Sequence, residues 1–432
     1  MGISPEFSQR RERFFSILDD NSIAIFTSND VGIMSNDVDY YYRQNSDLYY
    51  LSGFIEPKTV LIFEKSEEGT KFTMIVPPRD PEFETWNGRR SGVEGAKENF
   101  DANESYSNEN LEEVLSDKLP KYGKVYYEVG RSDKLDSIIL ELITKAYKKK
   151  RSKTLGPHIL VNSTSIVEKM RTKKTQYELE LMRRTNEISI EAHREAMKST
   201  KVGMKEYELE AVYMYHFYKN GARRPAYTSI VGSGVNTTIL HYIENDDTIN
   251  DGDLILADCG SEYKYYAADV TRTWPANGKF TDPQNEVYQI VLDVQNECIE
   301  MCKPGIKFKE IAGYSVKKLT EGMVKLGLLE GDVDKLIEDK KYRRFYMHGL
   351  GHWLGIDTHD TSRISLMEST LEPGHVFTIE PGIYIPEDDD IVEKYRGIGV
   401  RIEDDILITE NGHENLTGSL EKTVDELEKL LS

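Results

Sequence analysis

The chain has 432 residues, of which 38% are hydrophobic, and a formal net charge of −20 at pH 7. A chain of this length and apolar content can bury two ordinary cores, so we expect two domains. The negative charge opposes binding to nucleic acid or to an anionic membrane surface. No apolar run approaches the roughly 20 residues that span a bilayer, so we expect neither nucleic acid nor membrane as a partner.

The cysteines and the N-terminal segment bear on the location of the protein. Cys259, Cys298 and Cys302 cannot all pair with one another and show no Cys-x-x-Cys spacing. Such usage is typical of a reducing compartment. The N-terminal segment lacks the apolar stretch of a secretory signal. We therefore expect a cytoplasmic protein, with a trimmed organellar form as the alternative.

The first part of the chain alternates between strand-like and helical segments. Apolar runs at 22–26, 59–63 and 72–76 predict strands, and residues 135–149 predict a helix. This alternation is typical of an α/β domain. A polar joint over 148–165 separates this part from the rest of the chain. We predict one domain over residues 1–160 and a second over 161–432.

The second domain is expected to begin with helices. Thr175 and Glu178 form a capping-box pattern that predicts the start of a helix, and another helix should run from about 207 to 219. Strands should come next, then helices over 285–302 and 308–326, then further strands. The predicted strands carry most of the residues that suggest chemistry: His241, Asp258, Asp269, Glu380 and Glu403.

Two aspartates lie in strand-like contexts. Asp258 ends the apolar run 254–257, and Asp269 lies within the run 265–271. If the two strands form a hairpin whose turn is centred between Tyr263 and Lys264, the two aspartates face each other across the ladder. Their carboxylates would then share one site.

Two glutamates lie on later strands. Glu380 ends a short apolar strand, because Pro381 and Gly382 stop the strand just after it. Glu403 lies in a strand predicted over 399–408, where period-2 alternation places Arg401, Glu403 and Asp405 on one face. Acids and a base on a mostly apolar strand are costly unless something binds them.

A histidine pair completes the set. His348 and His352 lie four residues apart in a glycine-rich stretch, and His359 comes soon after. The four carboxylates at positions 258, 269, 380 and 403 carry four negative charges, which two divalent cations would cancel. Oxygen ligands with one imidazole favour Mn²⁺, Co²⁺ or Zn²⁺ over ions that seek thiolates.

Each of these residues also has a purely structural explanation. Asp258 and Asp269 could be ordinary strand-end acids. Glu380 could be a strand stop, and Glu403 could form half of an ion pair with Arg401. His348 and His352 could be satisfied core histidines. The joint occurrence of all these residues in this order favours a metal centre, because independent structural accidents would have to coincide five times.

The motifs around these residues resemble a known family. The segments 239–242, 258–260, 268–273, 348–355, 379–384 and 397–405 are similar to those of the M24 metallopeptidases, and most closely to the aminopeptidase P branch. The segments 42–54 and 86–90 resemble the non-catalytic N-terminal domain of that branch. The resemblance implies an α/β N-terminal domain and an α+β catalytic domain of the pita-bread fold.

The resemblance also implies a role for each metal ligand. Asp258 would bind one ion, and His352 and Glu380 would bind the other. Asp269 and Glu403 would bridge the two ions, which we expect to be Mn²⁺, with Co²⁺ or Zn²⁺ as alternatives. A hydroxide between the ions would attack the carbonyl that precedes proline.

Further residues would assist the reaction. The resemblance makes Glu380 the proton shuttle, and His241, His348 and His359 would stabilise the oxyanion and line the proline pocket. Residues expected to contact substrate or support the pocket are Arg401, Tyr384 and Trp86. Trp86 could instead be an ordinary core or edge aromatic. The N-terminal domain would support a homo-oligomer or help to wall the active site.

Three functions are compatible with these residues. The favoured one is an aminopeptidase that removes an N-terminal residue from peptides with proline in second place. The second is a prolidase, which uses the same ligands but takes only Xaa-Pro dipeptides. The third is a non-catalytic binding protein on the pita-bread scaffold, which the presence of all five ligands disfavours.

Overall fold

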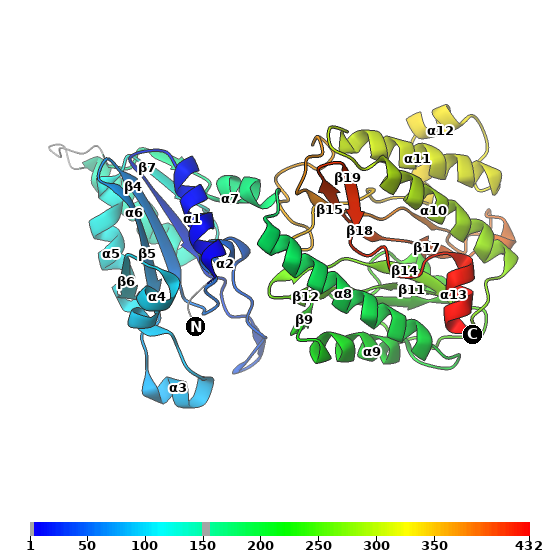
Figure 1. Cartoon of the computed structure of the whole chain (residues 1–432), viewed down its shortest axis with the longest axis horizontal. Coiled ribbons are helices and arrows are strands. Elements are labelled where there is room, and N and C mark those ends of the chain that lie inside the picture. The colour runs from blue at the N-terminus through cyan, green and yellow to red at the C-terminus, as the bar shows by residue number, and fades with distance from the viewer. Residues whose placement is uncertain (1–3, 149–155) are drawn as a thin grey trace. The chain divides into compact units, whose positions relative to one another are not determined.

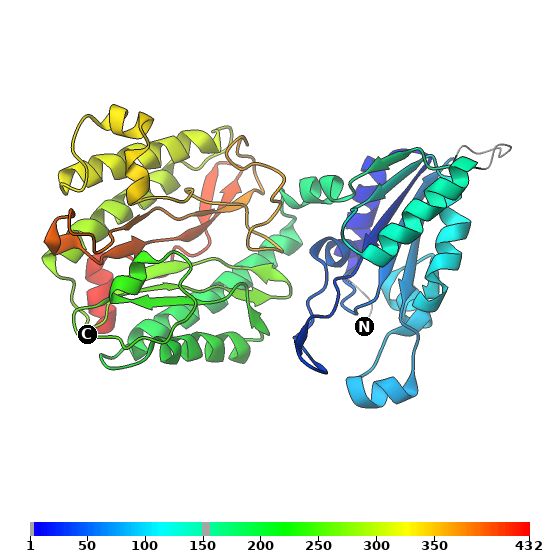
Figure 2. The same ribbon diagram turned by 180° about the vertical axis from the view of Figure 1, so that it is seen from behind.

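The computed structural model describes residues 4–148 and 156–432. The chain forms two compact units, Met1–Met170 and Arg171–Ser432 (Figures 1 and 2). The predicted domain boundary at residue 160 lies before this division, and residues 149–155 of the predicted joint lie outside the described residues.

Unit 1 is built around one mixed sheet with the strand order β6-β5-β4-β1-β7-β8. The strands β1, β4 and β5 pair antiparallel, whereas β5–β6, β1–β7 and β7–β8 are parallel. The predicted strands at 22–26, 59–63 and 72–76 are confirmed as β1, β4 and β5. The elements of the unit are α1 Pro5–Ile17, β1 Ser22–Thr27, β2 Ile33–Ser35, β3 Val38–Asp39, α2 Ser46–Ser52, β4 Val60–Ser66, β5 Gly69–Val76, α3 Pro81–Asn87, α4 Gly92–Phe100, β6 Glu104–Ser107, η1 Asn108–Asn110, α5 Leu111–Lys118, η2 Leu119–Lys121, β7 Lys124–Tyr127, α6 Asp133–Lys148, β8 Ile159–Val161 and α7 Thr164–Arg171.

Side-chain alternation along β1 explains why this sheet carries helices on both faces. Ile23 and Ile25 pack in one apolar cluster with side chains of α5 and α6. Phe26 points to the opposite face, where its ring lies 5.6 Å from that of Phe14 in α1. A strand buried on both faces reads as a continuous apolar run, which is why the sequence predicts it well.

Unit 2 contains a repeated order of two long helices followed by strands. Figure 1 shows α8 and α9 on one side of the strands and α10 and α11 on the other, and the reverse view agrees. One apolar cluster joins side chains of these helices to strands of both halves. The elements are α8 Gln176–Ser199, α9 Glu206–Lys219, β9 Arg224–Pro225, β10 Ile230–Ser233, η3 Gly234–Thr238, β11 Leu254–Asp258, β12 Ser261–Tyr263, β13 Tyr266–Ala267, β14 Thr271–Pro275, α10 Asp282–Met301, α11 Phe308–Lys325, α12 Val333–Glu338, η4 Lys341–Arg344, β15 Val376–Ile379, β16 Gly382–Tyr384, η5 Glu393–Tyr395, β17 Gly399–Arg401, β18 Asp404–Thr409, β19 Gly412–Asn415 and α13 Val424–Leu431.

The predicted helices of unit 2 are confirmed. Helix α8 begins with the expected capping box, in which the Thr175 side chain accepts from the Glu178 N–H and the Glu178 carboxylate accepts from the Thr175 N–H. Its buried side includes Leu181, Ile188 and Ala192. Helix α9 ends at Lys219, and helices α10 and α11 match the predicted segments within a few residues.

The register predicted for the Asp258 hairpin is wrong. In the structure Tyr263 pairs with Tyr266, so the two turn residues are Lys264 and Tyr265, and Asp258 pairs with Thr271. Lys264 and Tyr265 have φ of 48° and 74°, the left-handed conformation that such a tight turn needs and that Asn and Gly usually supply. Because lysine and tyrosine are not typical of such turns, the sequence does not mark this one.

The corrected register still keeps the two aspartates on one face. Asp269 lies two residues before Thr271, the direct partner of Asp258. Because side chains alternate with a period of two, Asp269 and Thr271 lie on the same side of the ladder. Asp269 is then a diagonal neighbour of Asp258 instead of its direct partner, a relationship that spans about 7–8 Å between Cα atoms.

Two other strand predictions differ from the structure. The strand predicted over 399–408 is two strands, because β17 pairs with β16 while β18 pairs with β15 and β19. Glu403 lies at the junction between them. His241 lies in a turn after η3 instead of on a strand, because a loop over 239–253 separates β10 and η3 from β11.

Candidate metal centre

Three of the predicted ligands converge in unit 2. One ligand atom from each of Asp269, His352 and Glu403 lies within 4.8 Å of the other two. Asp269 comes from the segment between β13 and β14, Glu403 from the junction of β17 and β18, and His352 from the irregular stretch before β15. Asp269 and Glu403 are buried, and His352 is partly exposed. The cluster therefore joins both halves of the unit.

The other two predicted ligands flank this cluster. An oxygen of Glu380, Oε1, lies 3.7 Å from Nε2 of His352. Asp258 is held by Arg401, whose Nη2 donates to Oδ2 at 2.7 Å, and by Tyr227, whose hydroxyl donates to Oδ1 at 2.5 Å. Neither acid belongs to the close group of three.

Burial makes charge on these acids unfavourable. Burial raises the pKa of Glu380 to about 7, and the negative charge of Asp269 adds to this shift. Burial and neighbouring carboxylates also raise the pKa of Glu403 well above its usual range. The pKa of Asp258 is raised by burial although Arg401 opposes the shift. The site thus contains several buried carboxylates and little positive charge to neutralise them.

His352 has the geometry of a metal-binding histidine. Its Nδ1 lies 2.9 Å from the carbonyl oxygen of Trp353, which can only accept, so Nδ1 carries the proton. The opposite nitrogen, Nε2, lies 3.2 Å from Oδ2 of Asp269. Metal-ligating histidines usually donate their other N–H in this way. Burial opposes a charge on His352, but the hydrogen bond and charge of Asp269 outweigh it and raise the pKa to about 9.

The residues present fit a divalent cation. Acids that are buried without cations are costly, and the usual remedies are proton uptake or a metal. Asp405 supports this conclusion: its Oδ2 accepts from the backbone N–H of Asp269 at 3.2 Å, while its Oδ1 is buried and has no hydrogen-bond partner among residues 4–148 and 156–432. The carboxylates of Asp269, Glu403 and Glu380 and the imidazole of His352 are the donor types that Mn²⁺, Co²⁺ and Zn²⁺ accept.

A chain of hydrogen bonds runs beside the metal cluster. Arg401 Nη1 donates to the hydroxyl of Tyr384 at 2.9 Å, and this hydroxyl lies 2.8 Å from Nε2 of His348. The other nitrogen of His348, Nδ1, lies 2.8 Å from the carbonyl oxygen of Gly349 and must donate to it. Nε2 of a neutral His348 therefore accepts from Tyr384. Burial and the charge of Arg401 lower the pKa of His348 to about 4, so the ring is neutral at pH 7.

The remaining predicted histidines lie at the exposed side of the site. The ring of His359 lies 4.4 Å from that of His352, nearly perpendicular to it. Burial and then the charge of His352 lower the pKa of His359. His241 is exposed, and its charge contributes to lowering the pKa of both His348 and His359. The structure thus places His348 beside Glu380 and His359 beside His352, with His241 close enough to act on both.

Trp86 lies in α3 of unit 1, where 83% of its surface is exposed. A side chain this exposed packs in no core, so the alternative of an ordinary core aromatic is wrong for this residue, while that of an edge aromatic stays untested. Its predicted role at the substrate stays a prediction.

Sequence reasoning missed two residues at the site. Tyr227 binds Asp258, and nothing in its sequence context indicated this. Thr271 donates from its hydroxyl to Oε2 of Glu403 at 2.7 Å and accepts from Nε of Arg401 at 3.1 Å. Its position two residues after Asp269, on the same strand face, was a signal that could have found it.

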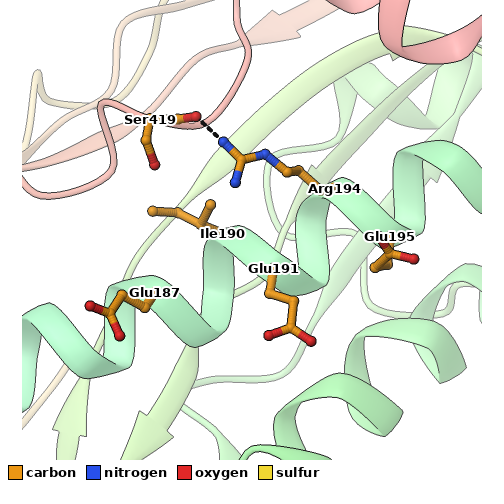
Figure 3. A pocket seen from close by; sticks show the side chains of 6 residues that line it. All are labelled: Glu187, Ile190, Glu191, Arg194, Glu195 and Ser419. Atoms are coloured by element: carbon orange, nitrogen blue, oxygen red, sulfur yellow. Dashed lines mark hydrogen bonds between the residues drawn. The ribbon is translucent and has the colours of Figure 1, made fainter.

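A surface pocket of about 350 Å³ lies elsewhere in unit 2. Figure 3 shows that most of its lining comes from α8, with Arg194 hydrogen-bonded to the backbone of Ser419. Arg194 also binds Glu421. The pocket contains none of the predicted site residues, and its glutamates are ordinary solvated helix-surface side chains.

Comparison with known proteins places the chain in a family. The profile described as "Metallopeptidase family M24" matches residues 180–410. The chain belongs to this family. A second profile, "Aminopeptidase P, N-terminal domain", matches residues 7–126. The family resemblance inferred from the sequence is therefore confirmed for both parts of this M24 chain.

Individual relatives match over almost the whole M24 chain. The Xaa-Pro aminopeptidase of Escherichia coli is 42% identical over 99% of this chain and 97% of its own. That of Haemophilus influenzae is 41% identical with the same coverage. The structure of zinc-substituted E. coli aminopeptidase P in complex with product has a TM-score of 0.96, with 41% identity over 100% of this chain and 99% of that chain.

These likenesses confirm the predicted fold class. The M24 chain has an α/β N-terminal domain followed by an α+β catalytic domain of the pita-bread fold. Divalent metal binding by the family agrees with the cluster of Asp269, His352 and Glu403. Among the described helices, none combines the length and apolar character needed to cross a membrane.

Proposed function

We propose that this M24 chain is a dinuclear metal-dependent aminopeptidase that hydrolyses the bond between an N-terminal residue and a penultimate proline. The convergence of Asp269, His352 and Glu403 is the observation that carries the proposal. Relatives named Xaa-Pro aminopeptidase, which match the full chain at 41% and 42% identity, supply the substrate class.

Five side chains would hold two divalent cations. Asp258 would bind one cation, His352 and Glu380 the other, and Asp269 and Glu403 would bridge them. Mn²⁺ is our first choice, with Co²⁺ and Zn²⁺ as alternatives, because oxygen ligands with one imidazole accept all three. When bound, such cations polarise a substrate carbonyl and lower the pKa of water.

Glu380 is suited to moving the proton. Its carboxylate lies beside the metal cluster, with Oε1 3.7 Å from Nε2 of His352, and a carboxylate within reach of the attacking water can accept its proton and pass it on. The bond to proline is a tertiary amide, so the leaving ring nitrogen must receive a proton as the bond breaks. We assign this delivery to Glu380.

Neutral His348 is suited to stabilise the oxygen of the scissile carbonyl. Its pKa of about 4 keeps it uncharged at neutral pH. Since its Nε2 accepts from Tyr384, its Nδ1–H is the donor that would reach the substrate oxygen, in exchange for the carbonyl of Gly349. We assign His241 and His359 to the wall of the proline pocket, because a substrate without an N–H must be recognised by shape. We assign Arg401 and Tyr384 to support of this pocket. We assign Trp86 to contact with substrate.

Three further proposals concern the roles of the domains, the assembly of the protein and its location. We infer that residues 1–160 form a non-catalytic domain and residues 161–432 the catalytic one. The N-terminal domain would serve assembly into a homo-oligomer, since exposed aromatic side chains such as Trp86 suit protein contacts. We further propose a cytoplasmic location, on the basis of its unpaired buried cysteines.

One assay tests the proposal against its rivals. The purified protein is loaded with Mn²⁺ and given Ala-Pro-Ala and the dipeptide Gly-Pro in parallel. Release of alanine from the tripeptide, at a higher kcat/KM than cleavage of the dipeptide, supports the aminopeptidase. Preference for Gly-Pro would make the chain a prolidase, and cleavage of neither with Mn²⁺, Co²⁺ or Zn²⁺ would favour a non-catalytic protein.

A further inference from the structure

A fully buried glutamate, Glu206, binds the segment that carries His241. Glu206 is the first residue of α9 and none of its surface is exposed. Its Oε1 accepts from the backbone N–H of Ser233 at 2.6 Å and from the Ser233 hydroxyl at 2.8 Å. The side-chain amide of Asn236 donates to the same oxygen at 3.2 Å. One oxygen thus holds the end of β10 and the start of η3.

The second oxygen of Glu206 holds the far side of the same segment. Its Oε2 accepts from the hydroxyl of Tyr242 at 2.8 Å and from the backbone N–H of Asp247 at 2.9 Å. All five donors come from residues 233–247, and all are neutral. A buried carboxylate without a cation depends on such bonds for its stability. His241 lies in the middle of the stretch that they fix.

His241 is flanked by two residues that point inward. Leu240 and Tyr242 pack in a small apolar cluster with Tyr384, while His241 itself is exposed. Tyr384 is the residue whose hydroxyl binds His348. The backbone at His241 is therefore fixed in two ways. Leu240 and Tyr242 pack against Tyr384, and the hydroxyl of Tyr242 binds Glu206.

We propose that Glu206 is a positioning residue, which holds the 233–247 segment so that His241 faces the substrate. This inference rests on the proposed function, because it assigns His241 to the active site. Glu206 acts through the segment and has no contact of its own with the reacting atoms. Its role differs from that of the metal ligands, since the bonds of Glu206 involve none of them.

The bond pattern makes Glu206→Gln a sharp probe. Each oxygen of Glu206 accepts from a backbone N–H, that of Ser233 on Oε1 and that of Asp247 on Oε2. A backbone N–H cannot reverse its role. Whichever way the new amide is turned, its NH₂ group meets an N–H, and the segment must move to separate them. The side chain keeps its size, so packing changes little.

The test compares wild type, Glu206→Gln, His241→Ala and the double variant on Ala-Pro-Ala. We expect Glu206→Gln to lower kcat/KM by roughly 10- to 100-fold, because small misplacements in an active site have effects of this order. In the His241→Ala background, Glu206→Gln should alter kcat/KM by no more than about twofold. This is the usual deviation from additivity between independent sites. The metal content by elemental analysis should equal that of wild type in all four proteins.

Non-additivity separates positioning from general destabilisation. A merely structural Glu206 would lower the rate equally in both backgrounds, and that outcome would overturn the inference. Full activity of Glu206→Gln, or of His241→Ala, would overturn it as well. An inactive wild type would instead refute the proposed function, so the two failures can be told apart.

Two further variants guard against trivial results. Glu64→Gln alters another buried glutamate that accepts from a tyrosine hydroxyl, that of Tyr122, but in unit 1; it should lower thermal stability and leave kcat/KM unchanged. If Glu206→Gln fails to fold, Tyr242→Phe removes one of the five donors and should give a smaller loss that again disappears in the His241→Ala background. Persistence of that loss would count against the inference.

Discussion

Nε2 of His352 lies 3.2 Å from Oδ2 of Asp269, a distance at which the two atoms share either a proton or a metal ion. In the metal-free protein the proton is favoured, because the carboxylate raises the pKa of His352 to about 9. A divalent cation must displace this proton to reach the nitrogen. Metal binding at this pair should therefore release protons.

Asp269→Ala should abolish both bound metal and hydrolysis. The change removes one of the three groups whose ligand atoms lie within 4.8 Å of each other, and we assign Asp269 to both ions. Elemental analysis after Mn²⁺ loading and alanine release from Ala-Pro-Ala measure the two effects. Asp293→Ala, at an exposed position on α10, serves as the matched control and should behave as wild type. Retention of metal and full activity by Asp269→Ala would contradict bridging.

Metal addition should raise the thermal stability of the wild type. A ligand that binds only the folded state stabilises it by about 2.7 kcal/mol at 100 times its Kd. A thermal scan with and without Mn²⁺ measures the shift. Glu403→Ala should lose most of it, since Glu403 belongs to the same cluster. An equal shift in this variant would place the ion elsewhere.

His348→Ala should keep the metal and lose rate. His348 lies beside Glu380, with Nδ1 3.6 Å from Oε2, but we assign it to no cation. Its Nδ1–H, which bonds the carbonyl of Gly349, is the donor that we assign to the oxyanion. Loss of one neutral donor to a developing oxyanion typically lowers kcat by about 10²–10³. Steady-state kinetics on Ala-Pro-Ala, with the metal content measured in parallel, checks both expectations. An unchanged kcat would remove His348 from the catalytic residues.

The sequence predicts best the elements whose pattern is local. The strand β1, which carries Ile23 and Ile25, is clear from the sequence because both of its faces are buried, and the capping box at Thr175 marks the start of α8 as expected. The grouping of acids with His352 came from motifs, not from spacing alone. The roles of these acids and of His352 in metal binding remain predictions.

The sequence-based predictions fail where a long-range contact or an unusual local conformation determines the structure. Lys264 and Tyr265 form a turn that normally takes Asn and Gly, so the hairpin register could not be read from them. The break at Glu403 depends on β17 and β18 joining different sheets, which is a tertiary effect. Tyr227 reaches Asp258 across 31 positions of the chain, and no periodicity reports such a contact.

Arg401→Met should destabilise the metal-free protein strongly. The Arg401 side chain is buried and binds Asp258, Tyr384 and Thr271. Removing the cation leaves the Asp258 carboxylate without its ionic partner, a change that typically costs about 3–5 kcal/mol. Urea unfolding measures it, and Mn²⁺ should restore part of the loss because the ion supplies the missing charge. Arg344→Met, which breaks an exposed pair with Asp390, should cost no more than about 1 kcal/mol.

His193 should make the stability of unit 2 depend on pH below neutrality. It is fully buried, with Nε2 3.0 Å from the carbonyl oxygen of Cys259 and Nδ1 2.8 Å from the hydroxyl of Tyr213. The carbonyl can only accept, so the neutral ring donates from Nε2 and accepts from Tyr213 at Nδ1. Burial, aided by the charge of Arg272, lowers its pKa to about 3.

The sign of the effect is set by proton uptake. Between about pH 6.5, where an unfolded histidine titrates, and the folded pKa, the unfolded state binds one proton more than the folded state. The free energy of unfolding therefore falls as the pH drops through this window. By pH 4.5 the loss should approach about 2–3 kcal/mol, at 1.36 kcal/mol per pH unit. Urea unfolding of metal-free protein at pH 7 and 4.5 measures this loss, and His193→Gln should show a smaller one, since the amide cannot take up a proton. An equal pH dependence in both proteins would show that other groups govern it.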